Sequence, residues 1–424
     1  MKNNKKIITK AFEEGISSGN PEVLVSKKIN KLSKNNFSPS HFLSIGKAAI
    51  SMAKAIIKFN PFIPGIILTN DDNFKKIDGY KCFNASHPIP DSRGYEAYLD
   101  IKIFLNSLKK SDHLILLLSG GGSALLPAPA QGITLEQKIK INTELLRSGL
   151  DINKVNAIRR LFSSFKGGKM ALIASPAKIT QLLISDVPGD NLESIASGLA
   201  SPDPIPLNET LKYLKETGLI KEAFVQRFLK KVQLGKISLP LNKNHSVFKN
   251  VSSYILANNS LCKKTIQSFL LKSFNLLDEI PPKLEGEASQ MGKKLADWSF
   301  KNFKSNSFIV IGGETTVTIS EENNKNLGGR SQEVALSFAI NVFEENSLNL
   351  PWIILSAGTD GKDGPTDAAG AVISSNCKFN LSDAKNYLKR HDSYNFLKKT
   401  SSLIKLKPTG TNLGDIVIII FGMK

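Results

Sequence analysis

The chain has 424 residues, 41% of them hydrophobic, so it is long enough for two or three domains with their own cores. Its formal net charge is +19, but only seven of the 56 basic residues are arginine, the residue that nucleic-acid readers favour, so we expect no nucleic-acid partner. Three widely spaced cysteines favour neither a disulfide framework nor a structural zinc site, and no apolar run approaches the ~20 residues of a membrane span.

These features predict a cytoplasmic protein that has no membrane partner.

Short apolar runs, each stopped by Gly, Ser, Asn or Asp, alternate along the chain with longer segments of helical period. This alternation is typical of parallel α/β architecture. The clearest expected strands are Phe42–Ile45, Gly65–Thr69, Leu114–Leu118, Gln181–Ile184, Ser253–Leu256, Phe308–Ile311, Trp352–Leu355 and Ile416–Ile420.

Capping signals predict three of the helices between these strands. Thr134 and Gln137 form a capping-box pattern for a helix that ends at about Arg147. Asp151 is expected to cap the next helix, which continues through Phe162. A further helix should begin near Ser331, after a pair of glycines.

The segment from about Pro202 to Asn250 has a different composition. It is rich in lysine, helical in period and punctuated by prolines, and it contains no glycine-rich strand end. We expect its lysines to form a solvated face and the segment to separate two α/β units, with the boundary after residue 245.

Ligands of open α/β sheets bind beyond the carboxyl ends of the strands, so the residues that follow each strand are the candidates for a site. Ser119, Gly120, Gly121, Gly122 and Ser123 follow one strand and form a loop whose backbone amides suit an anion at a helix N-terminus. The loop matches neither a Walker A loop nor a nucleophile elbow. Leu125 also replaces the third small residue of the dinucleotide fingerprint. A tight turn is the alternative interpretation.

Two further candidates for ligand binding lie in the same half of the chain. Lys47 is expected on the first turn of a helix, where a cation is unfavourable unless an anionic ligand is bound, although an ordinary surface lysine is the alternative. His87 lies in a proline-rich loop and is a candidate for substrate binding, with a structural role as the alternative.

Asp186 and Asp190 lie on a stiff turn at a strand end. One could accept a proton from a substrate hydroxyl while the other holds magnesium, and Asx-turn capping is the alternative.

The second half of the chain offers another set of polar loops. Glu314 follows a strand and two glycines, and Arg330 lies in a glycine loop from which its planar fork suits a carboxylate or phosphate. Asp360 belongs to the densest cluster of Gly and Asp, whose spacing excludes an EF-hand but leaves a magnesium-phosphate site open. Asn412 adds an amide before the last strand. Because the loops contain amides, cations and aspartates but no obvious Ser-His-Asp set, they fit a kinase better than a hydrolase.

Together these motifs resemble the glycerate 2-kinases that carry a C-terminal MOFRL domain. The similar stretches are Ser44–Ala49, Ala85–Gly94, Leu117–Pro129, Asn153–Lys169, Ile184–Pro204, Gly312–Glu333, Ala357–Gly370 and Pro408–Asp415. The resemblance implies ATP-dependent phosphorylation of D-glycerate at its 2-hydroxyl. It also implies a Rossmann-like N-terminal domain (residues 1–245) with a mainly parallel sheet. A smaller α/β C-terminal domain (246–424) would contain the MOFRL region at about 305–415, and the active site would lie in the interdomain cleft.

The resemblance further implies roles for the candidate residues. Lys47 and Arg330 correspond to essential cationic groups, and the pair Asp186 and Asp190 corresponds to the general base and a magnesium ligand, in either order. The remaining assignments are phosphate or substrate binding by Ser119, Gly120, Gly121, Gly122, Ser123, His87, Glu314 and Asn412, and magnesium binding by Asp360. The expected cofactors are ATP and Mg²⁺, and the expected assembly is a monomer or homodimer.

Two other functions remain as alternatives. Relatives of this class are also named hydroxypyruvate reductase, which would use NAD(P)H, but Leu125 argues against a dinucleotide site. A non-catalytic sugar-acid-binding protein would need the amide loops and Arg330 but not the paired aspartates. For a kinase, we expect loss of Lys47 or Arg330 to reduce the rate without a large loss of stability, because no buried partner would be left unpaired.

Overall fold

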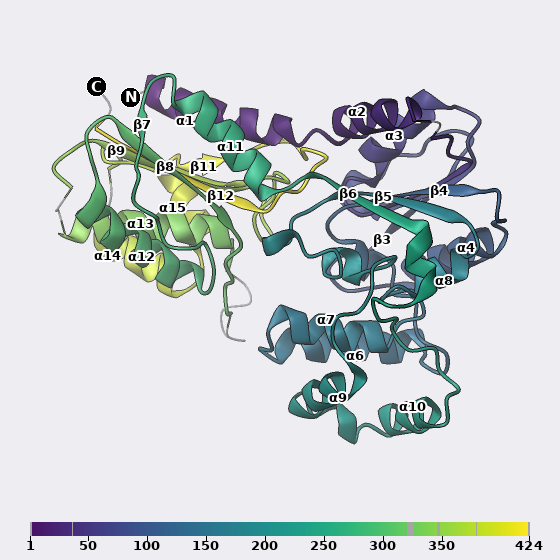
Figure 1. Cartoon of the computed structure of the whole chain (residues 1–424). Helices are drawn as coiled ribbons and strands as arrows, with labels where there is room; N and C mark the ends of the chain where they lie inside the picture. Colours follow the sequence, from purple (N-terminus) through teal and green to yellow (C-terminus); the bar gives the residue numbers. More distant parts are fainter. Residues whose placement is uncertain (1, 36, 320–325, 346–347, 379, 423–424) are drawn as a thin grey trace. The chain divides into compact units, whose positions relative to one another are not determined.

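The computed structural model describes residues 2–35, 37–319, 326–345, 348–378 and 380–422 (Figure 1). The contacts between residues divide the chain into two compact units. The N-terminal unit comprises residues 21–256, and the C-terminal unit combines residues 1–20 with residues 257–424. We use these two names below.

The N-terminal unit is built on a six-stranded sheet with the order β3-β2-β1-β4-β5-β6. Its strands are β1 (His41–Ile45), β2 (Gly65–Asn70), β3 (Lys81–Ala85), β4 (His113–Leu118), β5 (Lys178–Ile184) and β6 (Val251–Ala257). The pairings from β3 through β5 are all parallel. The central strands are apolar and buried on both faces, as expected for a sheet covered by helices on each side. The predicted Rossmann-like sheet is confirmed.

Helices cover both faces of this sheet (Figure 1). On one face lie α2 (Pro21–Ser33) and α3 (Ala49–Phe59), and on the other lie α4 (Ser92–Asn106) and α8 (Lys169–Ala174). Alternate residues of each strand face opposite sides, so Leu43 and Ile45 join the core beneath α4 and α8.

A second core in this unit is entirely helical. It is formed by α6 (Leu135–Arg147), α7 (Ile152–Leu161), α9 (Leu207–Glu216) and α10 (Ala223–Gln233). The predicted capping box of α6 and the Asp151 cap of α7 are both present. The ring centroids of Phe162 and Phe228 lie 4.7 Å apart within this core. The segment after Pro202 therefore packs onto α6 and α7 as a helical layer, and it does not separate the two units.

Three lysines of the N-terminal unit are buried, with Lys138, Lys166 and Lys169 each 2% exposed or less. Each ammonium donates to backbone carbonyl oxygens, for example that of Lys166 to the Leu126 oxygen at 2.7 Å. Burial lowers the pKa of Lys166 and that of Lys169 from 10.5 to about 7.

These pKa values predict a pH-dependent stability. The unfolded chain keeps the lysine protons up to about pH 10, whereas the folded protein releases them near pH 7, so stability rises as the pH increases from 7 toward 10. We expect a gain of roughly 1–2 kcal/mol per lysine between pH 7 and pH 9. The thermal midpoint of Lys166→Met should therefore rise less over this interval than that of the wild type. Lys236→Met, which removes an exposed lysine, is the control, and equal slopes for Lys166→Met and the wild type would contradict this interpretation.

The sheet of the C-terminal unit has the order β11-β10-β9-β12-β8-β7. Its strands are β7 (Asn275–Leu276), β8 (Ser307–Gly313), β9 (Trp352–Gly358), β10 (Gly370–Ser374), β11 (Leu403–Ile404) and β12 (Asp415–Phe421). All the pairings from β8 through β11 are antiparallel, and β7 pairs with β8 in parallel. The expectation of parallel architecture is therefore wrong for this unit, because strand-and-helix alternation in the sequence does not specify strand direction.

Helices also cover both faces of the second sheet (Figure 1). One face carries α1 (Lys2–Ser18) and α11 (Asn259–Leu270), and the other carries α12 (Ala288–Asn302), α13 (Arg330–Glu345), α14 (Leu381–Lys389) and α15 (Ser393–Lys399). Because α1 packs on α11, the first helix of the chain belongs to the C-terminal unit. The division also falls after residue 256 instead of 245, since β6 completes the first sheet.

Candidate active site

Two predicted segments meet at the carboxyl ends of β1 and β4, which are parallel neighbours. The backbone N–H of Lys47 donates to the Gly120 carbonyl oxygen at 2.9 Å, and the N–H of Ala48 donates to Ser119 Oγ at 2.9 Å. The strand order of this sheet reverses between β1 and β4, and doubly wound sheets bind ligands at such a reversal. Lys47 and the glycine-rich loop therefore lie where this fold type places its ligand.

Two glycines permit this close approach. Gly46 has a φ of +126°, and a β-carbon there would lie 2.2 Å from Ser119 Oγ. Gly121 has a φ of +86°, and a β-carbon there would lie 3.3 Å from both His87 Cδ2 and Lys47 Cγ. Both positions need glycine on conformational grounds. Gly121 consequently lies between the ring of His87 and the aliphatic stem of Lys47, which brings three predicted residues together.

Lys47 itself lies just before a helix. The helix α3 begins at Ala49, so the prediction that Lys47 occupies the first turn is wrong by two residues. The reason is Gly46, whose backbone conformation delays the start of the helix. The first turn of α3 contains no acidic residue, and its N-cap, Ala48, makes no side-chain cap. The positive end of the helix dipole and the Lys47 charge therefore act together to favour an anion here.

The glycine-rich loop opens the single-turn helix α5 (Gly122–Leu125) and is fixed from α7. Ser123 Oγ lies 2.9 Å from Ser197 Oγ, and Ser197 Oγ donates to Asn156 Oδ1 at 3.3 Å. Ser197 has a φ of +56°, in the left-handed region that is uncommon for residues other than glycine. Two hydrogen bonds made by Ser197 thus connect Ser123 of the loop to Asn156, a buried residue of α7.

The remaining predicted residues of this unit lie at the same edge of the sheet. Asp186 and Asp190 are partly buried on the turn after β5, the strand next to β4. The N–H of Asp190 donates to the Val187 carbonyl oxygen at 3.1 Å, which tightens that turn. His87 is exposed in the loop after β3. The strand ends therefore gather a lysine, an imidazole, two carboxylates and a loop of backbone amides.

The residues predicted to bind magnesium are divided between the two units. Asp186 and Asp190 belong to the N-terminal unit, and Asp360 belongs to the C-terminal unit. Within the part of the chain that the structure describes, no group of three or more His, Cys, Asp or Glu side chains is arranged to hold a metal ion. Two neighbouring carboxylates do fit magnesium that is coordinated mainly by nucleotide phosphates and water.

The C-terminal unit contains a second cluster, centred on Arg330. This arginine is the first residue of α13, and its Nε and Nη2 donate to the two carboxylate oxygens of Asp415 at 2.6 and 3.2 Å. Its Nη1 donates to the Glu314 carboxylate. Asp415 is 4% exposed, and on the two neighbouring strands it lies opposite Gly313 and Gly358. The guanidinium is thus held by a bidentate pair at the edge of the second sheet.

Asp363 caps the helix that Arg330 begins. Its carboxylate accepts hydrogen bonds from the N–H groups of Ser331 and Gln332 at 3.1 and 2.8 Å. A β-carbon at Gly329 would lie 2.3 Å from Asp363 Cγ, so the glycine makes room for this cap. A carboxylate from a distant loop therefore takes the place of a local N-cap side chain and fixes the start of α13.

Burial and charge set the ionisation of this second cluster. Burial and the neighbouring Asp415 raise the pKa of Asp363 to about 7. Burial likewise raises the pKa of Asp415 to about 6, against the opposing effect of Arg330. Burial lowers the pKa of Arg330, but the charges of Asp415 and Glu314 outweigh this and raise it above its ordinary value. Arg330 is therefore a permanent cation, and three of its five N–H donors are used in these contacts.

The other predicted residues of the C-terminal unit lie in the loops beside this cluster. Asp360 follows β9, and its Oδ1 accepts from the N–H of Lys362 at 3.1 Å. Asn412 precedes β12, and its Oδ1 accepts from the N–H of Gly414 at 3.2 Å. Glu314, Asp360 and Asn412 therefore occupy the edge of the second sheet at which Arg330 is held.

Sequence reasoning missed the residues that position these candidates. Asp363 and Asp415 lay within the glycine- and aspartate-rich stretches but were not assigned a role. The available signal was their place beside strand ends, since Asp415 directly precedes the last apolar run. Asn156 and Ser197 gave no comparable signal, because their contact with the loop joins segments that are far apart in the sequence.

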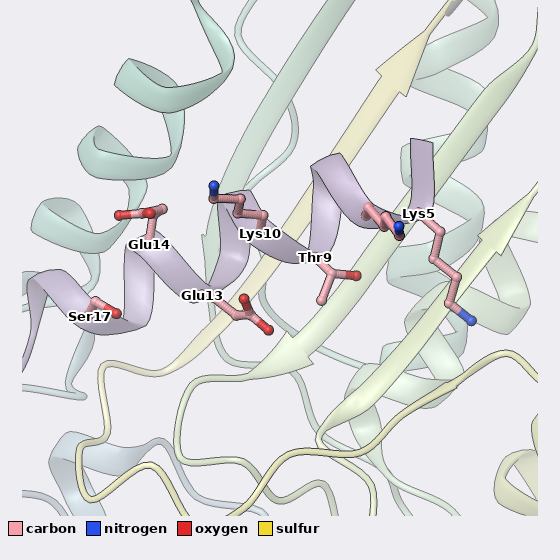
Figure 2. A pocket seen from close by; sticks show the side chains of 7 residues that line it. Lys5, Thr9, Lys10, Glu13, Glu14 and Ser17 are labelled. Carbon is pink, nitrogen blue, oxygen red and sulfur yellow. The ribbon is translucent and has the colours of Figure 1, made fainter. Parts of the chain in front are cut away.

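A hollow of about 670 Å³ lies elsewhere, along α1, and is lined by Lys5, Lys6, Thr9, Lys10, Glu13, Glu14 and Ser17. Figure 2 shows the labelled side chains spread along the helix instead of converging on one point. The hollow shares no residue with either cluster.

Among the described residues, no helix combines the length and the apolar character that crossing a membrane requires.

Comparisons with known proteins identify the family. Residues 7–230 match the family model described as a domain of unknown function (DUF4147), and residues 307–415 match the MOFRL family. The D-glycerate 2-kinase of Thermotoga maritima is 33% identical over 98% of this chain and 97% of its own. The glycerate 2-kinase of Pyrococcus horikoshii is 34% identical over 91% of this chain and 88% of its own.

A solved structure agrees with these matches. The crystal structure of glycerate kinase from Thermotoga maritima covers 99% of this chain and 100% of its own, with a TM-score of 0.83 and 32% sequence identity. The two family models follow each other along this chain in the order that the sequence motifs predicted. The chain therefore belongs to the glycerate 2-kinase family with a C-terminal MOFRL domain.

Proposed function

We propose that this protein transfers the γ-phosphoryl group of ATP to the 2-hydroxyl of D-glycerate and forms 2-phosphoglycerate. The observation that carries the proposal is the junction of Lys47 with the glycine-rich loop at the strand-order reversal of the first sheet. The names of relatives at 33% and 34% identity support the same substrate and the same hydroxyl.

The proposed roles follow from the chemistry of each group. Lys47, the amides of residues 119–123 and the positive end of α3 bind phosphate oxygens, since all three favour an anion. Arg330 supplies a second fixed cation whose remaining donors suit a carboxylate or phosphate. His87, Glu314 and Asn412 contribute polar contacts to the substrates.

The reaction itself requires one acceptor for a proton. The glycerate 2-hydroxyl oxygen attacks the γ-phosphorus, the bond from that phosphorus to the β,γ-bridging oxygen breaks, and ADP leaves with the electron pair. The hydroxyl proton passes to one carboxylate of the pair Asp186 and Asp190. Fixed cations stabilise the charge of the transferring group in the transition state.

Magnesium fits the same pair of carboxylates. The partner that does not take the proton would hold the ion together with ATP phosphates, and Asp360 is a further proposed ligand. When bound, the ion neutralises negative charge on the phosphates. The turn that carries these two carboxylates follows β5, and the glycine-rich loop follows β4, the neighbouring parallel strand, which supports this assignment.

The reductase alternative is less well supported. Leu125 is fully buried in the core where a dinucleotide fingerprint would place a small residue for close helix packing. The paired aspartates on the turn after β5 are also unnecessary for hydride transfer or for simple binding of a sugar acid, whereas phosphoryl transfer uses both.

A coupled assay separates the three functions. We expect ADP formation that requires both D-glycerate and Mg²⁺, and no oxidation of NADH or NADPH by hydroxypyruvate. Reduction of hydroxypyruvate without use of ATP would establish the reductase instead. Binding of D-glycerate without either reaction would identify a non-catalytic sugar-acid-binding protein.

A further inference from the structure

The N-terminal unit contains an unusual concentration of buried basic side chains around the end of α7. Lys138 Nζ donates to the carbonyl oxygens of Arg159 and Phe162 at 3.2 and 3.0 Å, and Lys169 Nζ donates to that of Arg160 at 3.0 Å. These carbonyls lie at the C-terminal end of α7, where the helix dipole is negative. The two lysines therefore have a structural explanation.

Arg160 also has a partner. Its Nε lies 2.9 Å from Asp203 Oδ2, and both side chains are almost fully buried. Its Nη1 donates to the Glu193 carbonyl oxygen at 3.3 Å. Asp203 is therefore the acidic partner of Arg160, and its charge also acts on Lys169. The other basic side chains of this group are Lys138, Lys166 and Arg159.

Arg159 differs from its neighbours. Among the residues that the structure describes, its guanidinium has no hydrogen-bond acceptor and no acidic partner, although the side chain is partly buried. Its charge acts on the ammonium groups of Lys138 and Lys166 and disfavours their protonated forms, so it lies close to two other cations. Burial lowers the pKa of Arg159 itself. A desolvated cation among like charges is unfavourable unless an anion joins it.

The position of Arg159 relates it to the candidate site. Asn156, one helical turn earlier on α7, accepts from Ser197, which bonds to Ser123 of the glycine-rich loop. Lys166, which lies near Arg159, donates to the carbonyl oxygen of Leu126, directly after α5. Hydrogen bonds through Ser197 therefore link the face of α7 that carries Asn156 to the loop that is proposed to bind phosphate.

We infer that Arg159 binds an oxyanion of one of the two substrates, either the carboxylate of glycerate or a phosphate of ATP. The inference rests on the proposed function for the identity of the substrates. The guanidinium offers five donors in a planar fork that matches either group. Lys138 and Lys169 also hold the end of α7 in place by their contacts with its carbonyl oxygens.

The test uses Arg159→Met, which keeps the length and apolar character of the side chain and removes its charge. Arg227→Met, which removes an exposed arginine of α10 in the same unit, is the matched control. The readouts are the Kd values for D-glycerate and for ATP, measured separately by calorimetry, and the thermal midpoint without ligand.

We expect Arg159→Met to weaken binding of one substrate at least tenfold and to raise the thermal midpoint by about 2 °C, because a partly buried charge without an acidic partner is removed. Weaker glycerate binding would identify the carboxylate as the bound group, and weaker ATP binding would identify a phosphate. Arg227→Met should change neither quantity. Unchanged affinity for both substrates, or equal weakening of both with a lower midpoint, would overturn the inference.

Failure of the proposed function gives a different result. If the wild type binds neither glycerate nor ATP, thermal protection by inorganic phosphate is measured on the same three proteins. Protection that is lost only in Arg159→Met would retain the anion site while refuting the kinase. Equal protection of all three proteins, or none in the wild type, would overturn the anion site as well.

Discussion

Arg330→Ala is expected to lower kcat/KM by roughly 100-fold or more and to destabilise the protein as well. The loss of rate follows from removing a fixed cation that interacts with the transferring group or the substrate carboxylate. The loss of stability follows from Asp415, which is 4% exposed and would keep a carboxylate without its bidentate partner. Because solvent reaches the guanidinium, we expect the free energy of unfolding to fall by only about 1–3 kcal/mol.

This expectation corrects the one drawn from the sequence, which held that no buried partner would be left unpaired.

The loss of stability in Arg330→Ala should also depend on pH. Burial already raises the pKa of Asp415 to about 6, and loss of Arg330 removes the main group that opposes this effect. The variant should therefore lose less stability at pH 5.5, where Asp415 takes up a proton, than at pH 8.

A second substitution separates the two effects of Arg330. In Arg330→Met with Asp415→Asn, no buried charge is left without a partner, so the thermal midpoint should recover toward that of the wild type. Activity should not recover, because the cation is still absent. If turnover returned together with stability, Arg330 would have a structural role only. Thermal midpoints and kcat/KM of the wild type, Arg330→Ala and the double variant decide this.

Lys47→Met is expected to lower kcat/KM by roughly 100-fold or more with little change in stability. The thioether keeps the apolar stem that lies against Gly121, and only the ammonium is lost. Removing a cation from the positive end of α3 relieves a repulsion, which offsets the loss of the contacts of the ammonium, so the free energy of unfolding should change little.

Lys54→Met is the control for Lys47, because Lys54 is an exposed lysine on the same helix. It should retain wild-type kcat/KM. The KM for ATP and the KM for glycerate, measured separately, show which substrate Lys47 contacts. Near-normal turnover of Lys47→Met would remove this residue from the site.

The sequence was most informative about strands and about the loops that follow them. Buried central strands are continuous apolar runs, and their carboxyl ends carry the polar residues, so the places of Lys47 and the glycine-rich loop could be predicted. The capping pattern of Thr134 and Gln137 likewise predicted α6, because the capping contacts are local.

The sequence could not predict features that depend on contacts between distant segments. The antiparallel order of the second sheet and the packing of α1 on α11 are of this kind. Asp363 caps a helix from more than thirty residues away, and Asp415 pairs with Arg330 across 85 residues. The burial of Lys138, Lys166 and Lys169 also contradicts the ordinary expectation for lysine, and only the surrounding carbonyl groups explain it.

The most direct test of the central claim is the identity of the phosphorylated product. The protein is incubated with ATP, Mg²⁺ and D-glycerate, and the product is analysed by phosphorus NMR against authentic 2-phosphoglycerate and 3-phosphoglycerate. We predict that the phosphorus resonance couples to the single proton on C2, as in 2-phosphoglycerate. A resonance that couples to the two protons of C3, or the absence of any phosphoglycerate, would contradict the assignment.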